Sequence, residues 1–264
     1  PLPLDPGDRN RTSPFAFTGN RFEFRAVGSS MSIAGSQVAL NTMMAESLDY
    51  VATELEKATA GKPDKLNAAV QGLLQKIMLE HDAVVFNGDG YSEEWHKEAV
   101  RRGLANLKTT PEALSQLSAP STIDLFTKHN VLTAAELRSR EEIYLEQYCK
   151  TIETEANLMV RIATTIIFPA AFRYQNELAQ ACANLKAIGK EYGTTTLDQL
   201  TTNLRAMQKV TYELQALVEG GKGDSAHTQA TFYCNSILPA MREVRKHADL
   251  LETIIADDLW VLPS

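Results

Sequence analysis

Cysteine is scarce in this sequence. Only Cys149, Cys182 and Cys234 occur among 264 residues, and no two of them form a CxxC pair. This usage predicts neither a disulfide framework nor a cysteine zinc site, and it fits a reducing cytoplasm best. Long apolar runs are also missing, because no run approaches the roughly 18 residues of a membrane span. No membrane association is therefore expected.

Basic clusters and metal-spaced histidines are absent as well. The formal net charge is −7, and no group of Lys and Arg is dense enough for a local nucleic-acid footprint, so nucleic acid is excluded as a partner. The five histidines never form a close pair, which favours surface or structural roles for them.

Two familiar ligand-binding loops are excluded because key positions carry the wrong residues. In "GGKGDS", Gly223 stands where a phosphate-binding P-loop needs Ser or Thr. In "VVFNGDGYSEEWH", placing Gly90 at the calcium-loop turn puts Val85 and His96 at the first and last ligand positions. We therefore expect neither a P-loop nor an EF-hand.

The composition that remains is that of a globular protein, with 44% hydrophobic and 22% charged residues. Residues 1–36 contain loop and strand patterns, whereas residues 37–264 have helical periodicity. We expect a mainly α fold, a bundle of long antiparallel helices with a small N-terminal β and loop element. The first residue is not Met and lies in a Pro-rich stretch, which suggests a piece of a longer polypeptide.

Helix boundaries are marked by capping residues. The first long helix has an expected buried stripe of Leu40, Met44, Leu48, Val51 and Leu55. Ser92 is expected to cap a helix that ends near Arg101 and Arg102, and Ser121 or Thr122 should begin another. Thr133 with Glu136 forms a capping-box pattern before a long helix, whose expected stripe is Leu137, Tyr144, Tyr148, Ile152, Met159, Ile162 and Ile166. Pro169 should kink or interrupt that long helix. A near-heptad seam then predicts a helical hairpin around "EGGKGDS", with Thr211 as its one polar position. The seam consists of Leu197, Leu200, Leu204, Met207, Leu214 and Val218.

The stretch "NRFEFRAVGSS" alternates strictly. In a strand, Phe22 and Phe24 would enter a core, while Arg21, Glu23 and Arg25 would form one charged row. Such a row is either a solvated sheet face or the floor of a site that handles anions and a metal.

Several segments together resemble the type III branch of glutamine synthetases. The family has an Asn-Arg-Ser-like turn before a strand of the form Arg-x-Glu-x-Arg, and Asn10-Arg11-Thr12 and Arg21-Phe22-Glu23-Phe24-Arg25 match it. "SIAGSQVALNTMMAESL", "VVFNGDGYSEEW" and "LRSREEIYLEQYCKTIETEANLMVRIA" also look like type III segments. The resemblance extends over most of the chain and implies a C-terminal portion of an α+β catalytic domain.

The resemblance implies a reaction and site residues. ATP would phosphorylate the glutamate side chain, and ammonia would displace phosphate from γ-glutamyl phosphate. Glu23 would bind Mg²⁺ or Mn²⁺, Arg25 would clamp the glutamate carboxylate or the transferring phosphoryl group, and Arg11 and Arg21 would approach the nucleotide phosphates. Hard oxygen ligands and fixed guanidiniums suit phosphoryl transfer.

The resemblance also has limits. The family carries a further Arg near the position of Ala16, and its other metal ligands and β-grasp domain would precede this sequence. The chain alone should be inactive, while the intact family is cytoplasmic and forms homo-oligomeric stacked rings.

Two alternatives stay open: a non-catalytic helical oligomerisation or interaction module, and a related ATP-dependent carboxylate-amine ligase. The Asn87–Gly90 turn is expected to precede a helix, with an active-site or subunit role as the alternative.

Overall fold

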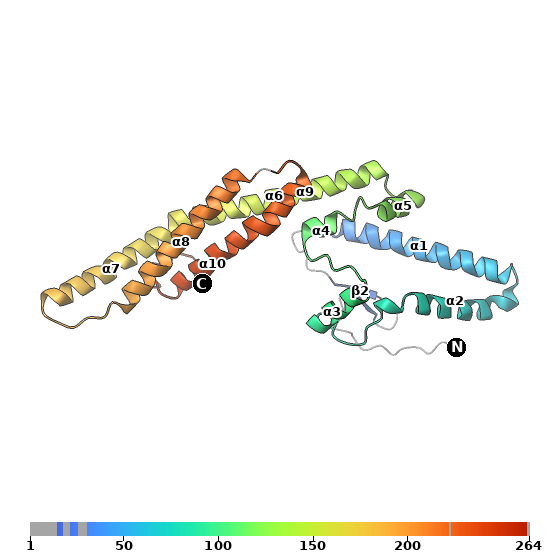
Figure 1. Cartoon of the computed structure of the whole chain (residues 1–264), viewed down its shortest axis with the longest axis horizontal. Coiled ribbons are helices and arrows are strands. Elements are labelled where there is room, and N and C mark those ends of the chain that lie inside the picture. The colour runs from blue at the N-terminus through green and yellow to red at the C-terminus, as the bar shows by residue number, and fades with distance from the viewer. Residues whose placement is uncertain (1–14, 18–21, 26–30, 222, 263–264) are drawn as a thin grey trace. The chain divides into compact units, whose positions relative to one another are not determined.

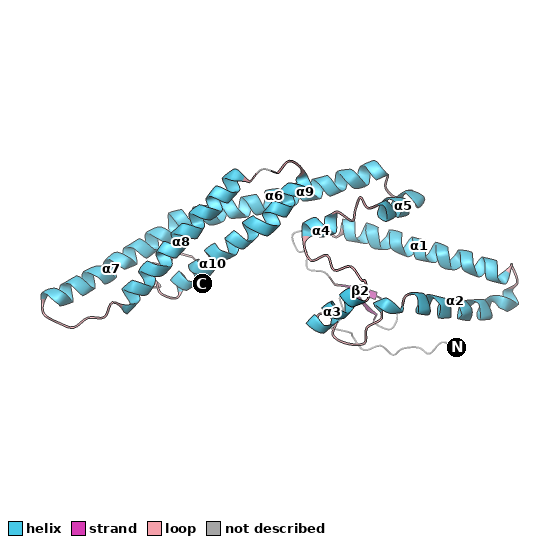
Figure 2. Cartoon of the chain, in the orientation of Figure 1, coloured by secondary structure: helices cyan, strands magenta, loops and turns pink. Residues whose placement is uncertain are grey.

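The computed structural model describes residues 15–17, 22–25, 31–221 and 223–262. Backbone contacts divide the chain into two compact units, Pro1–Lys108 with Ser118–Leu137, and Thr109–Leu117 with Arg138–Ser264. Helices make up most of each unit, so the expected mainly α fold is confirmed (Figures 1 and 2).

The first unit combines a strand pair with helices. Its elements are β1 (Phe15–Phe17), β2 (Phe22–Phe24), α1 (Ala34–Thr59), η1 (Pro63–Lys65), α2 (Leu66–Glu80), η2 (Asp82–Val84), α3 (Glu93–Arg101) and α5 (Pro120–Lys128). The strands β1 and β2 are antiparallel, with Phe15 opposite Phe24 and Ala16 opposite Glu23.

Helices α1 and α2 pack against each other but bury few side chains. The chain turns between them through two residues with positive φ, Ala60 at 48° and Gly61 at 74°. Thr42 is the buried residue of α1, and its hydroxyl donates to the Val38 carbonyl at 2.7 Å. Met44, expected on the buried stripe of α1, is exposed, as are other large apolar residues of α1 and α2. The helical period is correct, but this unit does not cover the whole apolar stripe.

An ionic cluster connects α1 to α5. Glu46 on α1 accepts hydrogen bonds from Lys128 Nζ and pairs with His129 Nε2, both at 2.7 Å. Lys128 also lies 3.0 Å from Asp49. The Lys128 hydrogen bond, followed by the His129 hydrogen bond, lowers the pKa of Glu46 below its ordinary value. These contacts fix the C-terminal end of α5 to α1 through charge rather than apolar packing.

The second unit is a bundle of long helices. Its elements are α4 (Thr110–Leu114), α6 (Ala134–Ile162, whose first turn belongs to the first unit), η3 (Ala163–Ile167), α7 (Phe168–Ala187), α8 (Thr195–Gly220), α9 (Ala226–Phe232), η4 (Tyr233–Ile237) and α10 (Leu238–Glu252). Helix α8 packs against α7 and α10, and the chain reverses direction between α8 and α9 (Figure 1). The predicted hairpin is therefore present.

The core of this bundle follows the heptad seam of α8. Leu200, Leu204, Met207, Thr211 and Leu214 are all buried. They face a similar stripe on α10, which buries its own apolar positions against α8. The predicted seam between α8 and α10 is confirmed, including the polar residue Thr211 within it.

On α6 the buried face agrees with the expected stripe at Leu137 and Ile152 but not at its two tyrosines. Tyr144 and Tyr148 are only half-buried, whereas Leu145 and Cys149 are buried. Small side chains such as Ala156 continue the buried face and let neighbouring helices approach closely. Periodicity alone favoured the bulky aromatic positions, which instead lie at the edges of the core.

Two π-helical turns interrupt the long helices, and each is followed by a proline. The turn η3 precedes Pro169, where an interruption was expected, and η4 precedes Pro239. A proline lacks the backbone N–H that an α-helix interior uses, so local rearrangement of the hydrogen bonds is needed there. The helices continue beyond both turns.

The capping predictions are confirmed, with one shift. Ser92 Oγ accepts from the Trp95 backbone N–H, and Thr133 and Glu136 form the reciprocal capping contacts of α6. Helix α5, expected from Ser121 or Thr122, begins instead at Pro120. Proline suits the first helical position, where its missing N–H has no intrahelical partner to lose.

The continuous helix of residues 134–187 has the length of a membrane span. Its most apolar 18-residue window has a mean hydropathy of 1.2, and 33% of that window is buried. Helix α7 also packs against α8 within the bundle. Core helices pass the same test of length and composition, so this segment is weak evidence for a membrane span.

Candidate functional site

The strand β2 and the residue after it carry the described part of the expected catalytic row. Arg25 Nη2 donates a hydrogen bond to Glu23 Oε2 at 2.9 Å, and each side chain is 26% exposed. Residues two apart in an extended chain share a face, which is why the two side chains meet. The contact holds a carboxylate and a guanidinium side by side and partly accessible.

Phe24, on the opposite face of β2, differs from its expected place. It was predicted to enter a core, but it is 50% exposed. The described sheet has only two short strands, and two strands alone bury little of one face. The alternation itself is correct, whereas the core that would cover Phe24 is not supplied by the described residues.

The rest of the predicted row lies outside the described residues. This applies to Arg21, and the structure likewise does not describe Arg11 of the predicted site or the side chain of Phe22. Within the described part of the chain, no group of three or more His, Cys, Asp or Glu side chains is arranged to hold a metal ion. The metal-binding role of Glu23 therefore stays a prediction.

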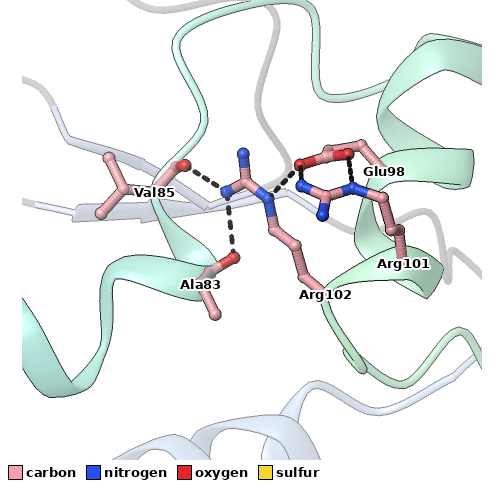
Figure 3. A network of polar contacts seen from close by, with 5 residues as sticks. All are labelled: Ala83, Val85, Glu98, Arg101 and Arg102. Carbon is pink, nitrogen blue, oxygen red and sulfur yellow. Dashed lines mark hydrogen bonds and ion pairs between the residues drawn. The ribbon is translucent and has the colours of Figure 1, made fainter.

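A second ordered site surrounds the "FNGDGYSEEW" segment (Figure 3). Arg102, just beyond the end of α3, donates through Nη1 to the carbonyl oxygens of Val85 at 2.7 Å and Ala83 at 3.2 Å. Its Nε donates to Glu98 Oε1 at 2.6 Å. One guanidinium therefore attaches the segment before the turn to the helix after it.

A pair of aromatic rings also joins this loop to α3. The rings of Phe86 and Trp95 stack, with centroids 4.4 Å apart and an interplanar angle of 22°. A Cβ added at Gly88 would lie 2.8 Å from two atoms of the Phe86 ring, which is too close for an ordinary contact. Glycine at this position lets the backbone pass next to the stacked ring.

Asp89 contributes to the turn itself. Its Oδ1 accepts a hydrogen bond from the Tyr91 backbone N–H at 2.9 Å, and its carbonyl accepts from the Ser92 N–H and hydroxyl. This Asx-type arrangement leads directly into the Ser92 cap of α3. The expected role of Asn87–Gly90 as a turn before a helix is confirmed, and the other suggested roles stay predictions.

Glu98 is the electrostatic centre of this region. Arg101 donates two hydrogen bonds to it, both at 2.6 Å, and Arg102 donates a third. Hydrogen bonding by Arg101, followed by that of Arg102, lowers the pKa of Glu98 to about 2. The carboxylate stays ionised at any pH near neutrality.

Sequence reasoning placed Arg102 only at the C-terminal end of a helix, where a positive charge suits the helix dipole. Its bonds to Ala83 and Val85 join residues 19 and 17 positions away. Likewise, the Glu46–His129 pair spans 83 positions. No local pattern predicts such contacts, because their partners lie far apart in the sequence.

Comparisons with known proteins agree with the sequence motifs. Residues 69–186 match the family model of the glutamine synthetase C-terminal domain. The chain is 40% identical over 273 residues to a type-3 glutamine synthetase of Dictyostelium discoideum, an alignment that covers 100% of this chain and 37% of that protein. It is 34% identical to glutamine synthetases of Bacteroides fragilis and Butyrivibrio fibrisolvens, over 99% and 98% of this chain.

The chain spans 37% of the length of each of these relatives. The matches cover nearly the whole chain, including the strand with Glu23 and Arg25 and the loop held by Arg102. The resemblance to glutamine synthetases is therefore confirmed, and this chain is related along its whole length to part of a type-3 glutamine synthetase, with the family's C-terminal domain at residues 69–186.

Proposed function

We propose that this chain is the C-terminal part of an enzyme that makes glutamine from glutamate, ammonia and ATP through γ-glutamyl phosphate. The observation that carries the proposal is the Glu23–Arg25 pair on one face of β2, in a chain related to glutamine synthetases along its length. Residues 1–36 would be the end of the catalytic sheet, and residues 37–264 the C-terminal helical region.

Each side chain of the row has a separate role in this proposal. Glu23 would bind Mg²⁺ or Mn²⁺, since both prefer hard oxygen ligands. The metal would neutralise charge on the nucleotide phosphates. Arg25 would bind the glutamate carboxylate or the transferring phosphoryl group, for which a planar guanidinium fork is well suited. Arg11 and Arg21 would bind the nucleotide phosphates.

The pair geometry supports this division of roles. Arg25 holds one oxygen of Glu23 at 2.9 Å, and both side chains are partly accessible, so the carboxylate is oriented rather than buried. Preorganised charges stabilise a transition state without having to move during the reaction. Because the described part of the row supplies only one carboxylate, the remaining metal ligands would come from the rest of the longer enzyme. The 264-residue chain alone would then be inactive.

The test measures phosphate release from ATP that depends on glutamate and ammonia, in the full-length enzyme. Glu23→Gln and Arg25→Lys are expected to lower kcat/KM by about a hundredfold or more, because removing one preorganised charge at a transition state costs that much. Glu146→Gln, an exposed carboxylate on α6, is the matched control and should retain wild-type activity.

Wild-type activity in both strand variants would return the row to a solvated sheet face. Loss of activity with an altered subunit assembly would instead indicate a structural effect, so size-exclusion chromatography accompanies each assay.

Competition by other amines would distinguish ammonia-dependent synthesis from a related carboxylate-amine ligase. We place the enzyme in the cytoplasm, as the cysteine usage favours.

A second candidate function is helical oligomerisation or protein interaction. The observation in its favour is the exposed apolar surface of α1 and α2, which includes Leu48 at 61%, Met78 at 70% and Leu79 at 82% exposure. Contiguous exposed apolar residues are typical of interaction surfaces. In the full-length enzyme this surface would contribute to stacked homo-oligomeric rings.

The interaction role has its own readout. Leu48→Lys and Met78→Lys should reduce the oligomer mass in light scattering, because a charge would have to be buried at the contact. Lys62→Glu, in the exposed turn between α1 and α2, is the control. An unchanged oligomer in both lysine variants would exclude this surface as a subunit contact.

A further inference from the structure

The second unit contains a cavity for which the proposed glutamine synthesis provides no use. Its volume is about 440 Å³, and it is lined by α6, η3, α8, α10 and the segment after α10. Its inner wall is apolar, with Ile167 from η3, Met207 from α8, and Met241 and Val244 from α10, all of them buried. Binding sites for small organic molecules usually have volumes of about 300–1,000 Å³ and mostly apolar walls.

The polar side chains at this cavity give it a negative balance. Arg245 forms an ion pair with Asp249, so these two charges offset each other. Glu155 on α6 and Glu252 on α10 are the other charged lining residues, and both are acidic. Glu155 is exposed, which places its carboxylate on the solvent side of the cavity. An anionic ligand would meet two carboxylates there, whereas a cation would be attracted to them.

Trp260 adds an aromatic surface to the same cavity. Its indole Nε1 donates a hydrogen bond to Glu252 Oε1 at 3.1 Å, which fixes the ring against α10. The ring lines the cavity together with Leu262, and both belong to the segment that follows α10. An aromatic face next to carboxylates is a favourable environment for an alkylated ammonium group, because the ring quadrupole attracts cations.

We propose that this cavity binds a small apolar molecule that carries one ammonium group. The apolar part would lie against Ile167, Met207 and Met241, and the ammonium group would lie near Glu155 and the Trp260 ring. Glutamate and ATP do not match this chemistry, because both are strongly polar and anionic. The proposal therefore goes beyond the proposed catalytic function and would survive its failure.

The experiment is calorimetric titration of the full-length protein with three probes of equal chain length, n-octylammonium, n-octanol and n-octanoate. We expect saturable binding of octylammonium, with an affinity about fivefold above that of octanol, since a partly exposed charge pair contributes this much. Octanoate should bind more weakly than octanol, because its carboxylate would lie near Glu155 and Glu252.

Three variants at the cavity and one control outside it test whether the binding belongs to the cavity. Ala248→Phe should abolish binding by filling the space. If the phenylalanine variant does not fold, Ala248→Leu fills less of the space and should weaken binding. Glu155→Gln should bring the affinity for octylammonium close to that for octanol. Glu153→Gln, an exposed carboxylate on the same helix that does not line the cavity, should bind like the wild type.

Melting temperatures of all variants establish that they are folded. The proposal is overturned if no probe binds saturably, if octanoate binds as tightly as octylammonium, or if folded Ala248 variants bind like the wild type. If the 264-residue chain binds the probes and the full-length protein does not, the rest of the polypeptide covers the cavity, which also overturns it. Catalysis by the full-length enzyme is a separate readout that none of these outcomes decides.

Discussion

The guanidinium of Arg102 lies over the indole ring of Trp95, with its central carbon 5.5 Å from the ring centroid. The same guanidinium donates to Ala83, Val85 and Glu98, so one side chain combines a cation–π contact with three hydrogen bonds. Arg102 is therefore the residue that holds the "FNGDGYSEEW" loop against α3.

Arg102→Ala should destabilise the chain by about 1–3 kcal/mol. Two backbone carbonyls would lose their donor, and the Trp95 ring would lose the cation that covers it. The measurement is the urea dependence of the circular dichroism signal at neutral pH. Arg101→Ala is the matched control, because Arg101 binds the same carboxylate but reaches no loop carbonyl, and its side chain is 73% exposed. Equal urea midpoints for the two variants would contradict the assigned role of Arg102.

Glu98 should make the stability of the first unit sensitive to acid. Its pKa is lowered from 4.5 to about 2 by the two arginines, so the stabilisation is fully present above pH 4.5 and is lost as the pH falls through about 2. Glu98→Gln should therefore be less stable than the wild type at pH 7, and the two proteins should converge as the pH approaches 2. Thermal melts across that range measure this difference, and a constant difference at all pH values would refute the coupling.

Thr211→Val should stabilise the bundle by about 1 kcal/mol. Thr211 is fully buried on α8, and its hydroxyl oxygen has no hydrogen-bond partner among the described residues. Valine has nearly the same shape and removes the cost of burying an unpaired polar group. Thr201→Val is the control with the opposite sign, because Thr201 accepts a hydrogen bond from Gln175 at 2.8 Å. A lower melting temperature for Thr211→Val would show that the hydroxyl has a partner in solution.

Two glycines allow a test of backbone conformation without side-chain clashes. A Cβ at Gly72, inside α2, or at Gly103, just after α3, would meet no atom within 4 Å. Only Gly103 has a positive φ, of 75°. Gly72→Ala should stabilise α2 by about 0.5–1 kcal/mol, whereas Gly103→Ala should cost about 1 kcal/mol or more. Chemical denaturation of both variants provides the comparison, and shifts of the same sign would contradict it.

Much of the helical architecture could be predicted because its determinants are local. The heptad seam of α8, the Ser92 cap and the Thr133–Glu136 capping box each depend on residues within a few turns of one another. The charged row of β2 followed from the two-residue period of a strand, although the extent to which Phe24 is covered did not. Periodicity identifies which side chains share a face, but it does not say whether another element covers that face.

The errors have the same physical origin. The stripe predicted on α6 is buried at Leu137 and Ile152, but Leu145 and Cys149 are buried in place of Tyr144 and Tyr148, since helix packing depends on the neighbour's shape as well as on hydrophobicity. The contacts of Arg102 and Glu46 were not anticipated, because they join residues far apart in the chain. The second π-helical turn was missed although Pro239 was visible in the sequence.

The π-helical turns at Ala163–Ile167 and Tyr233–Ile237 set the phase of the helices that follow them. A π turn contains one residue more than an α turn, and one residue corresponds to about 100° of rotation around an α-helix. Deleting a single residue from either turn would restore α-helical hydrogen bonding and leave the later side chains close to their present neighbours, whereas converting the turn to α-helix without a deletion would rotate all of them by about 100°. In this bundle, one added residue ahead of each proline determines which face of α7 and which face of α10 meet α8.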